Sequence, residues 1–365
     1  MNNDKRTILI TGAAGYVGEM LCDQLAKRDD VERIIALDKD EQTKLTKSLE
    51  KVLYIQANLA EAGWQNKVIP YMPDTIVHTA WQIRTLYGRE KEQWRLNVEA
   101  SEAVFNFAFA NRFVKKLIYF STAASYSARP ENSIEHYFTE AEGLRDDDYL
   151  YAKEKKVVEE KLYNTYSKAQ LEEKHYPQIT VLRPAAITGP KGRFMTVRFG
   201  LQSALRGDLK GGFLNKLVSL MTSYMPATTS WARQFVHEDD VLGVVTHLIF
   251  SPNAWSYEVF NLTPNGKPVL ADEMAKIVDK KVLMVPSWMV RLSFWSLWHL
   301  TRGRIPTSQG VWRVYSYPIL MSGDKLTVVY RCRYSSLEAI STTAGNYEYC
   351  VPEAEKVLNN LDSKN

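Results

Sequence analysis

The stretch TILITGAAGYVGEML, residues 7–21, constrains the fold of this chain more than any other. It begins as an apolar, β-rich run, turns through Gly12, Gly15 and Gly18, and continues as a helical pattern. The three glycines suit three separate needs: a tight turn, a close approach of the backbone to a pyrophosphate, and close packing of a helix on a sheet. The stretch therefore predicts a strand–turn–helix unit with an anion site at the start of its helix.

The alternation of strand and helix continues through the first half of the chain. The predicted strands are apolar on nearly every residue, which is typical of parallel strands that are covered on both faces. They span residues 7–11, 33–37, 52–55, 75–80, 117–122 and 179–184, with a further strand at 257–262. Helical patterns such as residues 18–28 and 99–113 lie between them. The fold class predicted is α/β, a doubly wound parallel sheet of the Rossmann type with a smaller, mixed C-terminal substrate region.

The regular alternation ends near residue 190, and this change suggests how the chain is divided. We predict a dinucleotide-binding Rossmann domain over residues 1–190, which also receives segments near 235–262. A substrate-binding C-terminal region is expected over residues 191–350, followed by a polar tail over 351–365.

The composition favours an ordinary globular protein without a nucleic-acid partner. Hydrophobic residues make up 45% of the 365 residues, charged residues make up 24%, and the net charge is only +4. No run of lysine and arginine indicates a nucleic-acid surface. The cysteines at 22, 332 and 350 lack metal-ligand spacing, so neither a zinc site nor a disulfide framework is expected. The chain enters a strand almost at once, and we expect a cytoplasmic protein without a signal peptide.

The most apolar stretch of the chain runs from Val282 to Leu300. Pro286 breaks it and Arg291 interrupts it, so no uncharged transmembrane span remains. Trp288 and Trp295 recur with helical spacing after Pro286, which predicts a helix with one apolar face. We expect that helix to be buried or half-buried; the alternative is a helix that borders a hydrophobic substrate, a partner or a membrane surface.

An acidic residue at the end of the second predicted strand complements the glycine turn. Asp38 is placed to accept hydrogen bonds from the adenosine ribose hydroxyls of a dinucleotide. Its carboxylate would also repel a 2′-phosphate, so NAD is expected rather than NADP, although the neighbouring Lys39 weakens that preference.

The stretch DDDYLYAKEKKVVEE, residues 146–160, contains two tyrosines that are each followed four residues later by a lysine. At about 100° per residue, the pair Tyr151 and Lys155 shares its helix side with an apolar stripe. The pair Tyr149 and Lys153 shares its side with charged residues and is expected to face solvent. Only Tyr151 and Lys155 are therefore predicted to point towards an interior site.

The glycine spacing in TGAAGYVG resembles the fingerprint of the extended short-chain dehydrogenase/reductase superfamily, in particular the NAD-dependent epimerase/dehydratase family. Further segments resemble the family in the expected order over residues 7–262: HTAW, RLNVEAS, FVKKLIYFSTAASYS, YAKEKKVVE, VLRPAAITGP and RQFVHEDDV. The resemblance implies an enzyme that uses reversible hydride transfer at a carbinol carbon with a bound NAD.

The same resemblance implies which residues bind the cofactor and which perform chemistry. Asn58 departs from the family, which usually has an aspartate there near the adenine. No metal is expected. The implied cofactor-binding residues are Gly12, Gly15, Tyr16, Val17, Gly18, Asp38, Asn58, Leu59, Thr79, Ala80, Trp81, Asn97, Tyr151, Lys155 and Pro184.

Tyr151 is the expected acid/base, because a neighbouring ammonium favours its phenolate. Lys155 would provide that ammonium and hold the nicotinamide ribose. Thr122 is expected to bind the substrate oxygen beside Tyr151, with Ser121 and Ser125 as rivals.

Three functions remain open on the sequence. The first is an epimerase or dehydratase of a sugar or nucleotide sugar, in which Arg233 would grip a diphosphate. The second is an NAD(P)-dependent dehydrogenase of a hydrophobic, hydroxysteroid-like alcohol. It is favoured by Ala186, which stands where nucleotide-sugar enzymes commonly carry an asparagine. The third is a non-catalytic NAD-binding regulator. A small-molecule substrate and a possible homodimer are the expected partners.

Overall fold

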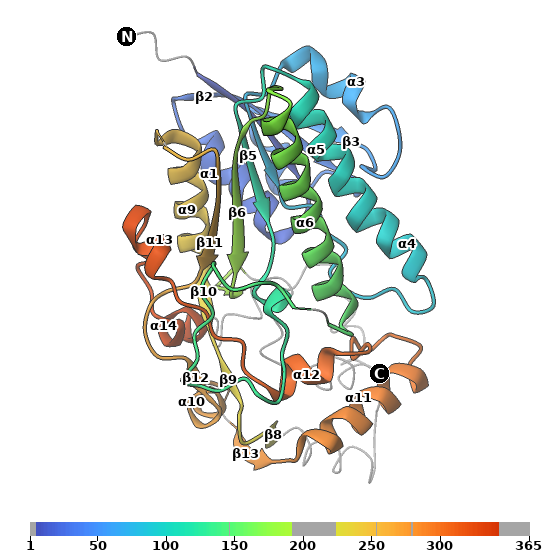
Figure 1. Cartoon of the computed structure of the whole chain (residues 1–365), viewed down its shortest axis with the longest axis vertical. Coiled ribbons are helices and arrows are strands. Elements are labelled where there is room, and N and C mark those ends of the chain that lie inside the picture. The colour runs from blue at the N-terminus through green and yellow to red at the C-terminus, as the bar shows by residue number, and fades with distance from the viewer. Residues whose placement is uncertain (1–4, 146, 192–223, 253, 279, 343–365) are drawn as a thin grey trace, which may run out of the picture.

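Seven parallel strands form the central sheet of the protein, with helices on both faces (Figure 1). The structure is a computed structural model and describes residues 5–145, 147–191, 224–252, 254–278 and 280–342. In spatial order the strands are β3 (Val52–Gln56), β2 (Val31–Asp38), β1 (Arg6–Thr11), β4 (Thr75–His78), β5 (Lys116–Phe120), β6 (Gln178–Pro184) and β11 (Tyr257–Leu262). This arrangement confirms the predicted doubly wound sheet.

The helices divide into two layers that enclose the sheet. α1 and α9 lie on one face, and α5 and α6 lie on the other (Figure 1). The helices of this part of the chain are α1 (Tyr16–Ala26), α2 (Lys44–Lys47), α3 (Trp64–Val68), α4 (Glu90–Trp94), α5 (Ala100–Ala110), α6 (Leu150–Leu171) and α9 (Glu238–Phe250). Short helical turns cover Ile69–Tyr71, Arg95–Glu99 and Ala123–Tyr126.

The alternating side chains of β1 show why its sequence is apolar at nearly every position. Ile8 and Ile10 belong to the core on the side of α1 and α9, where they join Leu21. Leu9, between them, belongs to the opposite core with Phe105 of α5. A strand covered on both faces needs apolar residues in both alternating sets, as the continuous run predicted.

The strand order reverses at β1, and this reversal locates the binding crevice. β1 pairs with β2 on one side and with β4 on the other. Ligands of open α/β sheets bind beyond the carboxyl ends of the strands at such a switch point. The strands predicted at 75–80 and 117–122 end two residues earlier, at His78 and Phe120, so the residues that follow enter loops at this carboxyl edge.

The C-terminal region consists of short elements, which explains why its sequence lacks a clear period. Three two-stranded pairs occur: β7 (Ala186–Thr188) with β10 (Phe235–His237), β9 (Ala232–Arg233) with β12 (Val269–Leu270), and β8 (Tyr224–Ala227) with β13 (Lys281–Met284). Its helices are α10 (Ala271–Ile277), α11 (Ser287–Leu300), α12 (Val311–Ser316), α13 (Asp324–Val329) and α14 (Ser336–Ser341). The predicted division into domains stays a prediction, and the tail at 351–365 lies outside the described residues.

Helix α11 forms where the tryptophan-rich stretch predicted a helix, and it is partly buried through Phe294, Leu297 and Trp298, but the apolar side that the spacing predicted faces solvent. Val290 is its one fully buried residue. Trp288, Leu292 and Trp295 are all exposed. Within the described part of the chain, no helix is long and apolar enough to cross a membrane.

A buried ion pair fastens the middle of α6 to β6. The Arg183 guanidinium donates from Nε to both carboxylate oxygens of Glu159, at 3.1 and 3.2 Å, and its Nη2 donates to the same carboxylate. A further N–H of Arg183 donates to the Tyr126 hydroxyl at 2.6 Å, and that hydroxyl donates to Asn261 of β11 at 2.9 Å. One network therefore joins α6, β6, β11 and the turn after β5.

Removing one partner of this pair should destabilise the fold strongly. We expect Glu159→Gln to cost about 3–5 kcal/mol, because Arg183 would keep a buried charge without its counterion. The measurement is the free energy of unfolding in urea. As a control, Glu102→Gln on α5 removes the partner of Lys161 of α6 in a partly exposed pair and should cost less than about 1 kcal/mol. Equal losses in the two variants would contradict the assigned role of the buried pair.

Candidate active site

The three glycines of the turn after β1 have the distinct surroundings that the sequence predicted. Gly12 has a φ of +74°, and a Cβ there would lie 2.6 Å from the Ala80 nitrogen at the end of β4. A Cβ on Gly18 would lie 2.1 Å from the Gly12 carbonyl oxygen, so α1 packs directly on the turn. Gly15 caps α1, and a Cβ there would meet only the Gly12 oxygen at 3.1 Å. The turn thus leaves the start of α1 approachable by an anion.

Asp38 lies at the end of β2, directly beside this turn. Its Oδ2 accepts a hydrogen bond from the Ala14 backbone N–H at 2.9 Å, and its Oδ1 accepts one from the Asp40 N–H at 3.0 Å. These bonds fix the carboxylate next to the glycines while each oxygen keeps a further lone pair. The geometry suits the predicted ribose contact, which stays a prediction.

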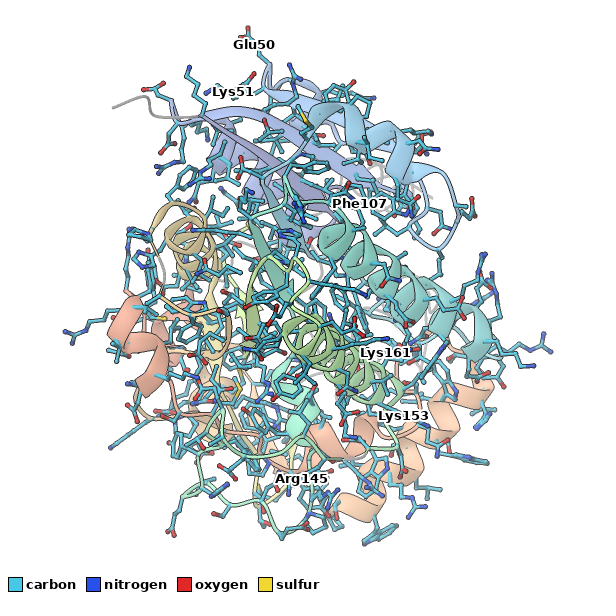
Figure 2. The ribbon with its side chains drawn as sticks, turned by 45° about the horizontal axis from the view of Figure 1, so that its top comes forward. Glu50, Lys51, Phe107, Arg145, Lys153 and Lys161 are labelled. Atoms are coloured by element: carbon cyan, nitrogen blue, oxygen red, sulfur yellow. The ribbon has the colours of Figure 1, made fainter. Side chains whose placement is uncertain are left out.

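Tyr151 and Lys155 both extend from the inward side of α6, as the helix geometry predicted. Lys155 is buried, as are Val158 and Leu162 further along the same side. In contrast, Lys153 is exposed (Figure 2). The Lys155 ammonium donates to the Phe120 carbonyl at the end of β5, so the helix side faces the carboxyl edge of the sheet.

Trp81 covers this pair. The Lys155 Nζ lies 3.6 Å from the centroid of the Trp81 ring, within the range of a cation–π interaction. The same indole meets the Tyr151 ring edge-on, with 6.3 Å between centroids. Trp81 follows Thr79, whose hydroxyl donates to the Thr11 carbonyl at 2.7 Å and so ties the end of β4 to the end of β1. Trp81 therefore contacts both predicted catalytic residues from the loop that follows β4.

Thr122 is the hydroxyl residue that interacts with Tyr151. It caps the turn Ala123–Tyr126, where its Oγ1 accepts the Ala124 N–H at 3.2 Å. A hydrogen bond between the Thr122 side chain and the Tyr151 phenol lowers the pKa of the phenol. Among the residues that the structure describes, the rival hydroxyls of Ser121 and Ser125 are buried and find no hydrogen-bond partner. The geometry therefore favours Thr122 over these serines as the residue that binds the substrate oxygen beside Tyr151.

Burial dominates the electrostatics of the two catalytic candidates. Desolvation raises the pKa of Tyr151 above its ordinary value, and the bond from Thr122 opposes that rise. Desolvation lowers the pKa of Lys155 well below its ordinary value, against the opposing pull of Glu159 and Glu154. The expected lowering of the phenol pKa by the Lys155 ammonium stays a prediction.

Tyr149 does not lie where the sequence placed it. It caps α6, which begins only at Leu150, so the helical angles do not apply to it. Tyr149 is half-buried, and its ring centroid lies 5.5 Å from that of Tyr151. A Cβ on Gly310 would lie 2.4 Å from the Tyr149 nitrogen, so the loop before α12 packs on this residue. The expectation of a solvent-facing Tyr149 was wrong because it assumed that Tyr149 is part of the helix, whereas α6 begins at Leu150.

A buried polar network behind the site was missed in the sequence. Asn97 accepts the Gln82 N–H through Oδ1 at 2.7 Å and donates to the buried carboxylate of Glu154 at 2.7 Å. Gln93 donates to the same carboxylate at 3.1 Å. Asn97 thus holds the backbone that follows Trp81 rather than facing the crevice directly. Glu154 lies three residues after Tyr151, on nearly the same helix side, and that spacing could have identified it.

The other predicted cofactor residues near the turn make local contacts. Tyr16 donates to the Glu238 carboxylate of α9. The Asn58 amide donates to Glu61 at 3.0 Å, and its oxygen accepts the Ala60 N–H at 3.0 Å. That oxygen keeps one lone pair for an adenine. Leu59 is buried, Val17 is partly buried against the core, and Pro184 ends β6.

Arg233 has contacts that argue against its predicted role. Its Nη1 donates to the carbonyls of Ala232 at 2.7 Å and Tyr317 at 3.4 Å, and its Nη2 donates to those of Val314 and Tyr315. Burial lowers its pKa to about 10. Both terminal nitrogens of Arg233 are thus bonded to backbone carbonyls, most of them at the C-terminal end of α12. A diphosphate could bind Arg233 only by displacing these hydrogen bonds.

A hollow of about 650 Å³ opens elsewhere, beside β11 and the later turns of α6. Tyr163, Tyr257 and Lys325 line it together with several glutamates. It contains none of the predicted site residues. We therefore place the candidate site at the carboxyl ends of β1 and β4 on the grounds of the residues gathered there.

Comparison with known proteins gives the family of the chain. The model of the NAD dependent epimerase/dehydratase family matches residues 8–263, and the chain belongs to this family. This confirms the resemblance seen in the sequence. No curated protein matches the chain.

Solved structures share the fold at low sequence identity. An epimerase from Methanothermobacter thermautotrophicus is 18% identical with a TM-score of 0.68, and the match covers 98% of this chain and 95% of that one. A dTDP-glucose 4,6-dehydratase from Bacillus anthracis in complex with NAD is 15% identical with a TM-score of 0.66, covering 94% and 97%. A UDP-glucose 4-epimerase from Thermotoga maritima with UDP-glucose is 18% identical with a TM-score of 0.65, covering 94% and 99%. At these identities the likeness shows the fold alone.

The buried ammonium of Lys155 should leave a signature in the pH dependence of stability. Between its lowered folded pKa and its ordinary value of 10.5, the unfolded chain binds the proton more readily than the folded chain does. Wild-type stability should therefore gain from Lys155 as the pH rises through this window. Lys155→Met lacks this gain, so it should be more stable than wild type at neutral pH, with an advantage that shrinks towards pH 10. Urea unfolding at several pH values measures it.

The exposed Lys153 provides the control for this experiment. Lys153→Met removes an exposed ammonium from the same helix and reports how the substitution itself changes the free energy of unfolding. If the difference between wild type and Lys155→Met is constant with pH, the depressed pKa of Lys155 is contradicted.

Proposed function

We propose that this protein is an NAD-dependent enzyme of the epimerase/dehydratase type, with Tyr151 as its acid/base. The observation that carries the proposal is the convergence of Tyr151, Lys155 and Thr122 at the carboxyl edge of β5, beside the glycine turn of β1. A glycine turn alone has many uses, but this triad beside it has the chemistry of a carbinol site.

The residues of the crevice suit a dinucleotide. The turn at Gly12 and Gly15 leaves backbone space and the start of a helix for a pyrophosphate. Asp38 would bind the adenosine ribose and disfavour the 2′-phosphate of NADP. Lys155 uses one of its three N–H groups on Phe120 and lies against the Trp81 ring, so its other N–H groups would reach the hydroxyls of the other ribose only if this indole gave up its contact with the ammonium.

The chemistry begins with a substrate hydroxyl bound between Thr122 and Tyr151. Tyr151, as phenolate, accepts the hydroxyl proton while Thr122 holds the oxygen, and the carbinol C–H bond breaks as a hydride leaves. NAD supplies the hydride acceptor when bound. Burial alone raises the pKa of Tyr151, so the phenolate depends on the positive charges brought beside it in the complex. In the reverse direction Tyr151 returns the proton to the carbonyl oxygen.

A sugar or nucleotide sugar is the substrate class that we favour. Family membership supports it, and so do the similar structures, which include a dTDP-glucose 4,6-dehydratase and a UDP-glucose 4-epimerase. The hydride then returns to the substrate and the cofactor is unchanged after each turnover.

A hydrophobic alcohol is the second candidate, and two observations favour it. Ala186 stands where nucleotide-sugar enzymes commonly have an asparagine, and the terminal nitrogens of Arg233 are used by backbone carbonyls. On this proposal the enzyme is a dehydrogenase that releases NADH.

Absorbance of NADH separates the two candidates. The protein is incubated with NAD and either UDP-glucose, dTDP-glucose or a hydroxysteroid. An isomerised or dehydrated sugar nucleotide without accumulating NADH supports the favoured proposal. Steady accumulation of NADH with the steroid supports the second candidate and contradicts the first.

Further features belong to the same proposal. We place the substrate on residues of the predicted region 191–350, over the carboxyl edge of the sheet. A cytoplasmic location and a homodimer complete the proposal; sedimentation of the purified chain tests the latter.

Tyr151→Phe should lower turnover by about 10³-fold, because the variant cannot accept or return the proton. NAD affinity, measured by calorimetry, should stay within about threefold of wild type, since the ring remains in place. Tyr163→Phe, on the same helix, removes an exposed phenol and is the matched control. Retained turnover in Tyr151→Phe would refute the assigned acid/base, and loss of turnover in both variants would point to general damage to α6.

Asp38→Ala should weaken NAD binding by about tenfold or more, because a charge-assisted hydrogen bond to the ribose is lost. NADP should bind better relative to NAD, since the repulsive carboxylate is gone. Asp29→Ala removes an exposed carboxylate before β2 and should leave both affinities unchanged. Titration of both cofactors provides the measurement; unaltered affinities in Asp38→Ala would show that the adenosine ribose lies elsewhere.

A further inference from the structure

The outward side of α11 is apolar although it faces solvent. Trp288, Leu292 and Trp295 are 64%, 56% and 61% exposed. Their spacing of four and three residues places them within about 60° of one another around the helix. On a helix at the surface of a globular protein, this is the side that normally carries polar residues.

The exposed apolar surface extends beyond these three residues. We call the set the α11 apolar face; it comprises Leu283, Met284, Trp288, Met289, Leu292, Trp295 and Leu300, all of which are exposed. Single exposed apolar residues are ordinary, but a continuous set on one helix and the strand before it marks an interaction site. Figure 1 shows α11 at the end of the molecule remote from β3, on its outer side.

The helix is firmly held, so its apolar side is presented in a fixed orientation. Val290 is buried on the opposite side. The Thr307 hydroxyl donates to the Phe294 carbonyl at 2.9 Å, and the Tyr317 hydroxyl bonds to Ser287 at 3.2 Å. α11 also packs against α12. Its exposed side is therefore not a consequence of a helix that has failed to dock.

The segment of the chain that carries most of the face has positive charge and no carboxylate of its own. From residue 280 to residue 323 the sequence has six lysines and arginines and no aspartate or glutamate, whereas the whole chain has nearly equal numbers, 46 and 42. Arg313 pairs with Asp148. Arg291, Arg302 and Arg304 are exposed and form no ion pair with any carboxylate in the described part of the chain. Apolar and cationic groups thus share one surface.

We propose that the α11 apolar face docks this protein on the surface of an anionic lipid bilayer. Tryptophan prefers the boundary between headgroups and acyl chains, and exposed arginines are attracted by anionic headgroups. A helix of 14 residues is about 21 Å long, shorter than the roughly 30 Å hydrocarbon core, so α11 lies in the interface and does not span it. A protein partner would explain why the tryptophans are exposed in the free chain. It would not explain why a segment of 44 residues around them contains no carboxylate.

Vesicle binding of the full chain tests the proposal. The probes are vesicles of phosphatidylcholine alone and vesicles with about 30% phosphatidylglycerol, where the surface potential is negative. Wild type should sediment with the anionic vesicles only, with a blue shift of tryptophan emission and quenching by lipids brominated on the acyl chain. Raising the salt from about 0.05 to 0.5 M should weaken binding at least tenfold, because headgroup attraction is screened.

Two double variants separate the apolar and the charged contributions. The first double variant, Trp288→Ser with Trp295→Ser, should lower the vesicle partition coefficient at least about tenfold. The second, Arg291→Glu with Arg302→Glu, should lower it by a similar factor. Leu171→Ser and Val328→Ser are the apolar controls, because these residues are 85% and 87% exposed outside the face. Lys67→Glu, an exposed residue of α3, is the charge control. All three controls should bind vesicles like wild type, and every variant should keep the wild-type melting temperature.

Three results would overturn the proposal. The first is that wild type does not sediment with anionic vesicles. The second is that the variants of the face bind as tightly as the controls do. The third is that the tryptophan variant converts a dimer to a monomer without any lipid binding in wild type, which would show that a second copy of the chain covers α11.

Discussion

The buried ion pair between Glu159 and Arg183 fixes the position of α6, and with it the position of the residues proposed to react. It ties α6 to β6 through two buried side chains, so the helix cannot rotate or slide without separating two buried charges. Lys155 lies one turn before Glu159 and Tyr151 lies two turns before it. Through Arg183 the same network reaches Tyr126, which closes the turn that Thr122 caps. The position of the site is thus set by a charge pair that does not itself react.

Burial serves function here at a cost in stability. Desolvation disfavours the charged form of Lys155, which nevertheless lies against Trp81 and the Phe120 carbonyl. A lysine held in this way is poised to give its N–H groups to a ligand that carries hydroxyl oxygens. The buried Glu154 on the same helix accepts a hydrogen bond from Asn97, which in turn holds the backbone of Gln82. The strain of placing these groups inside the protein is offset by the two cores that enclose the sheet.

Much of the fold and the site could be predicted because the signals were local. The apolar runs gave the parallel strands, the glycine spacing gave the turn, and helix angles gave the inward side of α6. What the sequence could not indicate came from contacts that are distant in sequence or from element ends. The role predicted for Arg233 stays a prediction, but no local pattern encodes its bonds to carbonyls 81 to 84 residues away. Tyr149 was misplaced by a single residue at a helix start. For α11, periodicity predicted the helix but could not tell which surface would cover its apolar side.

The central claim is that a dinucleotide lies across the carboxyl ends of β1 and β4 with its nicotinamide beside Tyr151. A crystal structure of the full chain grown with NAD measures this directly. The account predicts electron density for the pyrophosphate at the turn of Gly12 and Gly15, and for the nicotinamide ring within contact of Tyr151 and Lys155. Density for the cofactor in the hollow beside β11, or a nicotinamide ring remote from α6, would contradict it.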